Sequence, residues 1–250
     1  MVREVRLRQR ARVRRFHNAH RGERCFIVGN GPSLNAVDLR RLQGERTFGV
    51  NGIYLKRDEM GFEPTYYIVE DPLYMQQHAE RINQIDYAVR FFPERYIDLV
   101  PNPGENTCFL LFDWSLYKPA SSGYREPRFS TDIERRVGTG GSVTFVALQV
   151  AFYMGFDPVY LVGMDHNIVV PPTAEHVIRN RYRFAGSDPN HFRSDCGAGT
   201  EVYLPQWDVV NRGFTRARDA FECDGRRIYN ATTGGKLELF ERVDFGSLFS

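Results

Sequence analysis

The segment Cys25-Phe26-Ile27-Val28-Gly29-Asn30-Gly31-Pro32-Ser33-Leu34 decides how this chain folds. Four consecutive apolar residues, Cys25 to Val28, are typical of a strand that is buried on both faces, and the glycines after them permit a tight turn. Ser33 is a good N-cap residue, so we expect a short helix to begin there and to run to about Leu42. A strand that passes through glycines into a helix is typical of the first crossover of a parallel α/β sheet.

The alternation of short apolar runs with helical segments continues along the chain. The segment that follows Ser142 is apolar almost all round, so we expect a buried helix that Gly155 closes. Strands that alternate with helices predict an α/β fold that is Rossmann-like, with a mostly parallel sheet and helices on both faces. The other predicted strands are 47–50, 66–69, 87–92, 107–112, 159–163 and 227–229, and the other predicted helices are 72–85 and 206–223.

Two polar stretches interrupt this alternation. Residues 113–137 are rich in turn residues, and we expect them to form a surface loop over the edge or the mouth of the sheet. Residues 167–205 are polar and contain prolines, which predicts an irregular insert. Because loops beside the ligand site close over it in many enzymes, this insert is a candidate lid.

The composition favours one globular domain. A chain of 250 residues with 42% hydrophobic and 14% aromatic residues can bury a substantial core. It contains no run of 18 apolar residues and no signal-peptide pattern, so we expect neither a membrane span nor export. The four cysteines form no C-x-x-C pair, which argues against a zinc site and against a disulfide framework and favours a reducing cytoplasm.

The charge is distributed unevenly. Residues 1–24 hold nine arginines against Glu4 and Glu23, a net +7 that leaves −5 for the other 226 residues because the whole chain carries +2. We therefore divide the chain into a basic leader helix, 1–23, and a nucleotide-binding catalytic domain, 24–250.

The leader has two interpretations. Val5, Val13 and Phe16 favour a solvated helix that packs on the domain through its few apolar residues. In the alternative, residues 1–21 contact acidic lipid headgroups at a membrane surface. We do not expect a nucleic-acid partner, because the rest of the chain is acidic.

Polar side chains follow three of the predicted strands. Asn30, Asn51 and Asp71 each come directly after an apolar run or its turn. The carboxyl ends of parallel strands meet at one edge of the sheet, where open α/β sheets bind ligands. Each residue alone also fits an ordinary turn or a helix cap. Together they predict a nucleotide site at this edge.

Two glycine-rich turns precede predicted helices, Gly29–Ser33 and Gly138–Ser142. Glycines let the backbone approach a ligand, and the free N–H groups of a helix N-terminus suit a phosphate or a carboxylate. Either segment can instead be a tight turn that needs positive φ. The predicted nucleotide-contacting residues are Gly29, Asn30, Gly31, Ser33, Asn51, Asp71, Thr139, Gly140, Gly141 and Ser142.

Three residues are candidates for acid–base chemistry. Asp165 and His166 end a predicted strand, and His191 lies in the insert. A histidine can take the proton from an attacking hydroxyl, although most lone histidines are structural or exposed. The sequence has no Asp-x-Asp pair, so we predict no metal site; isolated acids such as Asp71 would have to hold any ion.

Three segments carry a resemblance to a known family: Cys25–Leu34, Phe48–Asn51, and Gly155–Asp165 with the sequence GFDPVYLVGMD. They resemble bacterial and archaeal domains named after the archaeal 6-hydroxymethylpterin diphosphokinase. That family is similar to the bacterial sialyltransferases that use CMP-sialic acid, and to the central domain of motility-associated flagellin glycosylation factors. The resemblance covers about residues 24–245.

The resemblance implies a Rossmann-like sheet with a lid, and a role in surface glycan or polysaccharide assembly. In the sialyltransferases two asparagines contact the CMP group, and Asn30 and Asn51 match their positions. The loop Thr139–Ser142 approximately matches one that lines the donor site. The general-base histidine of the family lies in the lid, where His191 is the best match. Lid tyrosines steady the departing phosphate, and the candidates here are Tyr182 and Tyr203.

The leading hypothesis is an inverting, metal-independent glycosyltransferase that needs no cofactor. Its donor would be a nucleotide-activated sugar such as a CMP-nonulosonate, and its acceptor a glycan or a lipid-linked molecule. One alternative is a Mg-dependent transferase of the 6-hydroxymethylpterin diphosphokinase type that uses ATP. Another is a non-catalytic nucleotide-binding module at the membrane surface. We expect a cytoplasmic location, with a peripheral position at the inner membrane face and a homo-oligomer as open options.

Overall fold

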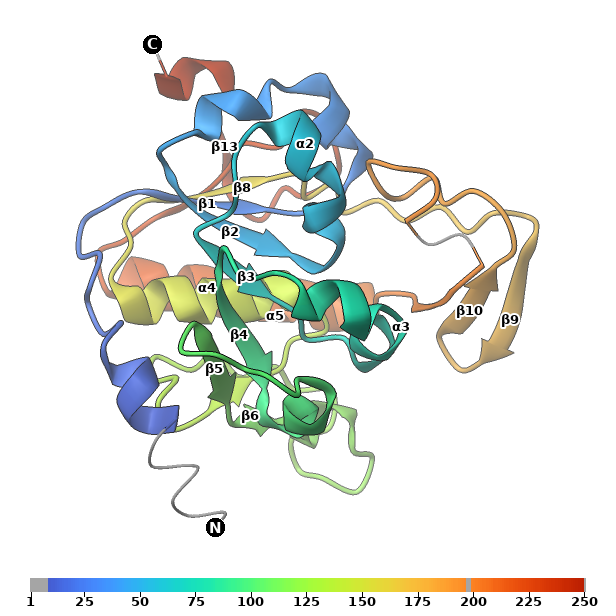
Figure 1. Cartoon of the computed structure of the whole chain (residues 1–250), viewed down its shortest axis with the longest axis horizontal. Helices are drawn as coiled ribbons and strands as arrows, with labels where there is room; N and C mark the ends of the chain where they lie inside the picture. The colour runs from blue at the N-terminus through green and yellow to red at the C-terminus, as the bar shows by residue number, and fades with distance from the viewer. Residues whose placement is uncertain (1–8, 197–198, 250) are drawn as a thin grey trace.

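The computed structural model describes residues 9–196 and 199–249 and is built around a sheet of eight strands (Figure 1). The strands are β1 (Cys25–Val28), β2 (Arg46–Val50), β3 (Tyr66–Ile68), β4 (Val89–Pro93), β5 (Thr107–Leu110), β8 (Val159–Val162), β12 (Ile228–Asn230) and β13 (Glu241–Arg242). Their order is β13-β12-β8-β1-β2-β3-β4-β5, and all neighbouring pairs are parallel. The predicted α/β, Rossmann-like fold is confirmed.

Helices cover both faces of this sheet. Successive strand residues point to opposite faces, so Ile27 of β1 packs in one apolar core and Phe26 in another. The core around Ile27 contains the apolar residues of α4 (Val143–Met154) and α5 (Trp207–Cys223), whereas the core around Phe26 contains those of α3 (Pro72–Asn83). The helices that the sequence predicted at these places are confirmed.

α4 shows most directly how the sequence specifies an element. Ser142 accepts a hydrogen bond from the Thr144 amide as N-cap, and Gly155 ends the helix with φ 87°, a conformation that glycine adopts without strain. Between these residues every side chain except Phe152 is buried, as the nearly continuous apolar sequence predicts. The helix therefore holds its N-terminus in a fixed place beside the sheet.

The strand order reverses at β1. This strand pairs with β2 on one side and with β8 on the other, so the chain extends the sheet in both directions from it. In doubly wound sheets, ligands bind outside the carboxyl ends of the strands at such a point. The segments that follow the two strands, Gly29–Ser33 and Gly163–Asp165, contact each other there.

The segment after β1 is not the single helix that we predicted for residues 33–42. It forms two short 3-10 helices, η1 (Pro32–Ala36) and η2 (Leu39–Leu42), and Ser33 lies inside η1 and not at its N-cap. The Ser33 hydroxyl donates to Asp165 Oδ2 at 2.7 Å, so a tertiary partner uses the side chain that would have capped a helix.

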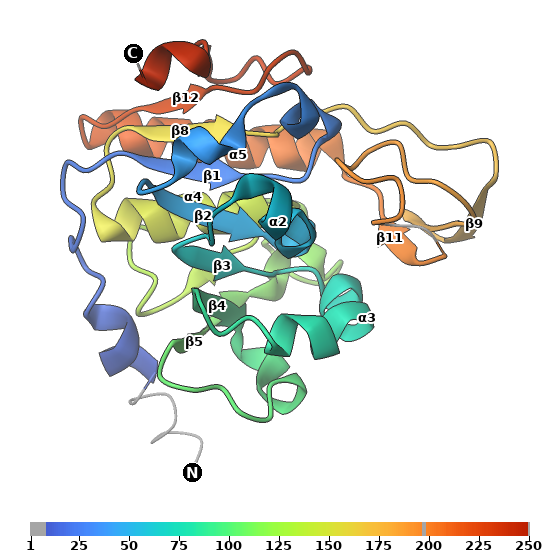
Figure 2. The same cartoon turned by 45° about the horizontal axis from the view of Figure 1, so that its top comes forward.

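The insert 167–205 is more regular than we predicted. It contains β9 (Ala174–Ile178), β10 (Arg181–Phe184) and β11 (Glu201–Tyr203), which form a separate antiparallel sheet in the order β11-β10-β9. We name this sheet the lid sheet. Figures 1 and 2 show it at one end of the molecule, away from the eight-stranded sheet.

Short elements complete the described chain. The stretch 113–137 is mostly loop, as predicted, and lies between β6 (Phe112–Asp113) and β7 (Val137–Gly138), which pair in parallel. The remaining elements are η3 (Asn51–Lys56), α2 (Arg57–Met60), η4 (Glu94–Leu99), η5 (Trp114–Tyr117) and η6 (Gly246–Phe249). Within the described ranges, no helix is long and apolar enough to cross a membrane.

The described part of the leader packs on the domain. Residues 9–14 are helical, Val13 and Phe16 are buried in the core that contains α4, and the Phe16 ring lies 5.4 Å from that of Phe91. The Asn18 amide donates to Tyr153 O at the end of α4. The packing through Val13 and Phe16 is as predicted, but the helix ends at residue 14 and residues 15–22 form turns. Val5 lies outside the described residues. Figures 1 and 2 show residues 9–23 and the lid sheet at opposite ends of the molecule.

Candidate active site

A cavity of about 1160 Å³ opens between the carboxyl edge of the sheet, the N-terminus of α4 and the lid sheet. Residues just after β2 and β3 form its floor, and Gly141 and Ser142 border it from α4. The turn between β9 and β10 and the segment 203–206 after β11 form the opposite wall. The polar strand ends and the lid that we predicted from the sequence thus surround one cavity.

Four of the predicted nucleotide-contacting residues line this cavity: Asn51, Asp71, Gly141 and Ser142. Asp71 is also the N-cap of α3, where its Oδ1 accepts from the amides of Leu73 and Tyr74. Burial raises the pKa of Asp71, although these two hydrogen bonds oppose the rise. Asp71 therefore both caps α3 and lines the cavity.

Asn51 combines a special backbone with an unsatisfied side chain. Its φ is 44°, in the left-handed region, and its carbonyl accepts a hydrogen bond from the Tyr67 hydroxyl at 2.6 Å. Its Oδ1 is buried and lacks a partner among the described residues, and the same holds for Oδ1 of Asn30. Buried acceptors without donors are unusual in folded proteins. The two asparagines of the resemblance thus each offer a free acceptor at a strand end.

The residues at the reversal point, by contrast, already have protein partners. The Gly31 amide donates to Gly163 O at 3.0 Å, and Ser33 donates to Asp165 through both its amide and its hydroxyl. A Cβ on Gly31 would lie 1.7 Å from Asp165 Oδ2, so only glycine leaves room for this carboxylate. The Gly29 amide donates to Val162 O. These amides, which we expected to face a phosphate, are used within the fold.

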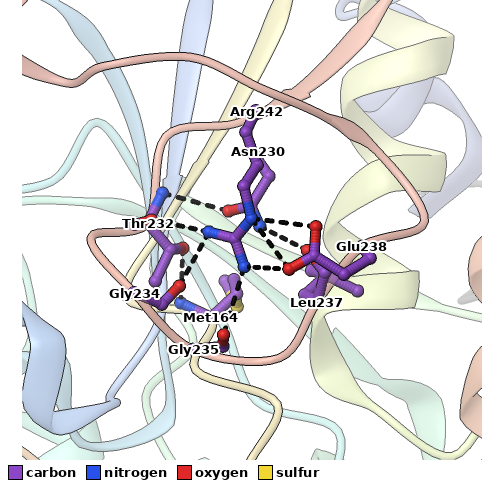
Figure 3. A network of polar contacts seen from close by, with 8 residues as sticks. All are labelled: Met164, Asn230, Thr232, Gly234, Gly235, Leu237, Glu238 and Arg242. Atoms are coloured by element: carbon purple, nitrogen blue, oxygen red, sulfur yellow. Dashed lines mark hydrogen bonds and ion pairs between the residues drawn. The ribbon is translucent and has the colours of Figure 1, made fainter.

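A polar network that the sequence did not predict is centred on Arg242 and includes Met164, the residue before Asp165 (Figure 3). The guanidinium of Arg242 donates to the carbonyls of Thr232, Gly234 and Gly235 and pairs with Glu238 at 2.7 Å. It fixes a loop whose Lys236 amide donates to Asp165 O, and whose Thr232 hydroxyl accepts from the Met164 amide. The network therefore holds the end of β8 against η1.

His191 forms a dyad with a buried acid. Its Nδ1 lies 2.5 Å from Asp188 Oδ2, and Asp188 is 1% exposed. Burial opposes the charge of this carboxyl, but its bonds to His191 and Asn190 outweigh burial and keep the pKa of Asp188 low. The neighbouring Phe192 amide donates to Asn30 O, which places the dyad beside the end of β1. His191 is not among the residues that line the cavity.

The other predicted residues lie away from the cavity wall. His166 Nε2 pairs with Asn211 Oδ1 at 2.8 Å, and burial lowers the pKa of this histidine. Thr139 is buried and donates to Asp113 O, and Gly140 leaves space for the ring of Phe145. The structure thus separates the predicted acid–base residues from this cavity.

The two candidate lid tyrosines differ in position. Tyr203 lines the cavity and is 43% exposed. Tyr182 does not line it, and its ring packs edge-on against that of His176 at 5.0 Å. Only Tyr203 is therefore placed to meet a ligand in the cavity.

Cationic side chains also line the cavity, and the sequence patterns did not single them out: Arg95, Lys118, Arg125, Arg179 and Arg181. Arg125 pairs with Asp208 at 2.5 Å, and Arg181 pairs with Glu201. Among the described residues, Arg95, Lys118 and Arg179 have no ion-pair partner, and the Arg95 guanidinium lies 4.6 Å from the ring of Trp114. Cations without carboxylate partners on a cavity wall suit an anionic ligand.

Glu70 is an acidic residue on the cavity wall that the sequence analysis did not identify. It is 6% exposed, directly precedes Asp71, and accepts a hydrogen bond from the Tyr117 hydroxyl. Burial and the nearby charge of Asp71 raise the pKa of Glu70 to about 7, and the Tyr117 bond opposes them. No cluster of three or more His, Cys, Asp or Glu side chains suited to a metal ion occurs in the described part of the chain.

Comparison with known proteins identifies the family to which the sequence is similar. Residues 5–170 match the family described as 6-hydroxymethylpterin diphosphokinase MptE-like. Among solved structures, the MAf glycosyltransferase from Magnetospirillum magneticum AMB-1 superposes with a TM-score of 0.55 at 16% sequence identity. The match covers 97% of this chain and 39% of that one, so this chain spans well under half the length of that protein. No curated protein matches the chain in sequence.

Proposed function

Because this chain belongs to the 6-hydroxymethylpterin diphosphokinase MptE-like family, we propose that it is a transferase that moves a sugar from a nucleotide-activated donor to an acceptor hydroxyl. The observation that carries the proposal is the cavity of about 1160 Å³, which combines unpaired cations with a free asparagine acceptor at the carboxyl edge of a parallel sheet. The name of the solved glycosyltransferase with the same fold also supports it.

The donor would lie along the cavity, with its phosphate among the cations. Arg95 and Arg179 would pair with phosphate oxygens, and the N-terminus of α4 at Ser142 would add its partial positive charge. Trp114 and Tyr203 offer aromatic surface for a base or a sugar ring. Asn51 Oδ1 would accept a hydrogen bond from an amino or hydroxyl group of the nucleoside.

The same groups suit the chemistry of transfer. As the bond between the anomeric carbon and the phosphate breaks, negative charge grows on the leaving nucleotide, and fixed cations stabilise it. In this proposal arginines do the work that a metal ion does in other transferases, and a single displacement inverts the anomeric centre. A CMP-nonulosonate donor and an acceptor in surface glycan synthesis remain part of the proposal and rest on the resemblance. A cytoplasmic location is also part of it and rests on the unpaired cysteine pattern.

The first experiment is a thermal-shift screen with CMP, UDP, GDP and ATP, each with and without Mg²⁺. A ligand that binds only the folded protein raises its melting temperature, by an amount that grows with the ratio of concentration to Kd. We expect one nucleotide to raise the melting temperature equally in Mg²⁺ and in EDTA. The matching nucleotide-sugar should then be hydrolysed slowly without an acceptor. If no nucleotide shifts the melting temperature, the proposal is wrong.

A second candidate is a Mg-dependent transfer of diphosphate from ATP to a pterin-like alcohol. The family description, which names a 6-hydroxymethylpterin diphosphokinase, favours it. This activity would be abolished by EDTA, and ATP would raise the melting temperature only when Mg²⁺ is present. The two candidates therefore separate in the same screen.

A further inference from the structure

Glu70 is a buried carboxyl that faces a cavity and lacks a cationic partner. It follows β3 at the carboxyl edge of the sheet and is 6% exposed. Among the described residues no Lys, Arg or His forms an ion pair with it, and its Oε1 accepts one hydrogen bond, from the Tyr117 hydroxyl at 3.2 Å. A buried charge without a cation is costly, so proteins keep such groups mainly where they are used.

The surroundings of Glu70 hold it in place and make it a proton acceptor near neutral pH. Its backbone carbonyl accepts from the Tyr96 hydroxyl at 2.5 Å, which fixes the strand end. The ionisable groups around the side chain are Asp71 from the start of α3, Tyr96 from η4 and Tyr117 from η5. Arg95 of η4 lines the same cavity. Burial and the charge of Asp71 together raise the pKa of Glu70 to about 7.

We propose that Glu70 is the general base of the transfer reaction, which takes the proton from the attacking hydroxyl inside the cavity. This inference rests on the proposed function and names the group that activates its acceptor. The acceptor oxygen forms a bond to the anomeric carbon while its proton passes to a carboxylate oxygen of Glu70. The bond from that carbon to the phosphate oxygen breaks, and its electron pair leaves with the nucleotide among the cations. Without an acceptor, water takes the place of the hydroxyl.

This assignment competes with His191, which the family resemblance favours. The His191 dyad lies beside the end of β1, whereas Glu70 and the unpaired cations line one cavity. A base must lie within hydrogen-bond reach of the hydroxyl that attacks the donor. If the donor phosphate lies among the cations of the cavity, Glu70 shares its space and His191 does not.

The test uses the full chain and donor hydrolysis, with the nucleotide-sugar that the wild type cleaves. Glu70→Gln keeps the size and the hydrogen-bond acceptor for Tyr117 but cannot take a proton. We expect its kcat to fall by about 10²- to 10⁴-fold, with nucleotide binding by thermal shift unchanged. The control is Glu80→Gln, on the exposed side of α3, which should behave as the wild type.

A pH profile separates catalysis from a structural role. In the wild type, log kcat should rise with pH up to about 7 and then level, because the ionised carboxylate is the active form. Tyr117→Phe removes a bond to the carboxylate and should move this limb to higher pH. Asp71→Asn removes the like charge but can still cap α3, and should move the limb to lower pH.

Two results would overturn the inference. If the wild type hydrolyses the donor and Glu70→Gln keeps its rate and pH profile while His191→Gln loses both, His191 is the base and the proposed function stands. If the wild type binds no nucleotide and cleaves no nucleotide-sugar, the proposed function fails and the inference fails with it.

Discussion

Replacing Glu70 by Gln should make the protein more stable, and more so as the pH rises. The pKa of Glu70 is raised from its ordinary value of 4.5 to about 7 by burial and by the charge of Asp71. The folded protein therefore binds this proton more tightly than the unfolded chain. Its contribution to stability is fully present below pH 4.5, falls as the pH rises, and is lost above about pH 7. Gln carries no such titration.

The size of the effect follows from the pKa shift. A rise from 4.5 to about 7, at 1.36 kcal/mol per pKa unit, corresponds to about 3 kcal/mol of stability that the wild type loses across this range. For a chain of 250 residues this is roughly 6 to 12 °C in melting temperature. Titrating groups that do not interact with Glu70 affect both proteins alike, so the difference between variant and wild type reports mainly on Glu70.

Urea unfolding of both proteins at pH 5 and at pH 8.5 measures this difference. We expect similar free energies of unfolding at pH 5, and a variant that is about 3 kcal/mol more stable at pH 8.5. A gap that stays the same at both pH values, or a wild type that is the more stable one at pH 8.5, would refute the reasoning. Such an outcome would mean that Glu70 is solvated or paired with a cation in solution.

Three further predictions concern the supports of the site. Gly31→Ala places a methyl group against Asp165 and should cost about 1 to 3 kcal/mol in urea unfolding. The same change should cost less in an Asp165→Gly background, and an equal cost in both backgrounds would contradict the packing. Arg242→Ala removes donors to three carbonyls and should cost about 2 kcal/mol, with faster amide exchange at Lys236; unchanged exchange there would rule out the role of the network. Phe16→Ala should cost about 3 kcal/mol, which a leader detached from the domain would not show.

The sheet and the long helices were predictable because their signals are local. Cys25–Val28 is apolar without interruption and α4 is nearly so, and such runs are typical of buried elements. Ser142 and Gly155 marked the ends of α4 correctly because capping depends on backbone geometry within one turn. Predicting these elements therefore requires no knowledge of the contacts that they make across the fold.

The site was predicted only in part, because its key contacts are long-range. Ser33 looked like a helix cap, yet it bonds to Asp165, which is 132 residues away in the sequence. Glu70 carries no motif, and its raised pKa comes from burial at a strand end that only the folded chain creates. Nothing in the sequence distinguishes Arg95 and Arg179 from the other arginines. They line one cavity only in the folded chain, where η4 and the lid sheet bring them together. The position of Asn51 and Asp71 at the cavity was predictable because strand ends meet at one edge of a parallel sheet.

The lid sheet illustrates a different limit of sequence reasoning. Its strands are short, and β9 and β10 are mostly exposed or half-buried, so they show little of the apolar alternation that identifies strands. They are held by pairing and by ion pairs such as Arg183 with Glu201, which composition alone does not reveal. Sequence analysis therefore predicts loop for polar strands of this kind.

Titration calorimetry tests most directly whether a nucleotide phosphate binds among the cations of the cavity. The nucleotide that raises the melting temperature would be titrated into the wild type, Arg95→Gln, and the control Arg135→Gln, an exposed arginine outside the cavity. We expect Arg95→Gln to weaken the Kd by roughly 10- to 100-fold, and Arg135→Gln to bind as the wild type. Equal affinity in all three proteins would place the nucleotide elsewhere and contradict the account.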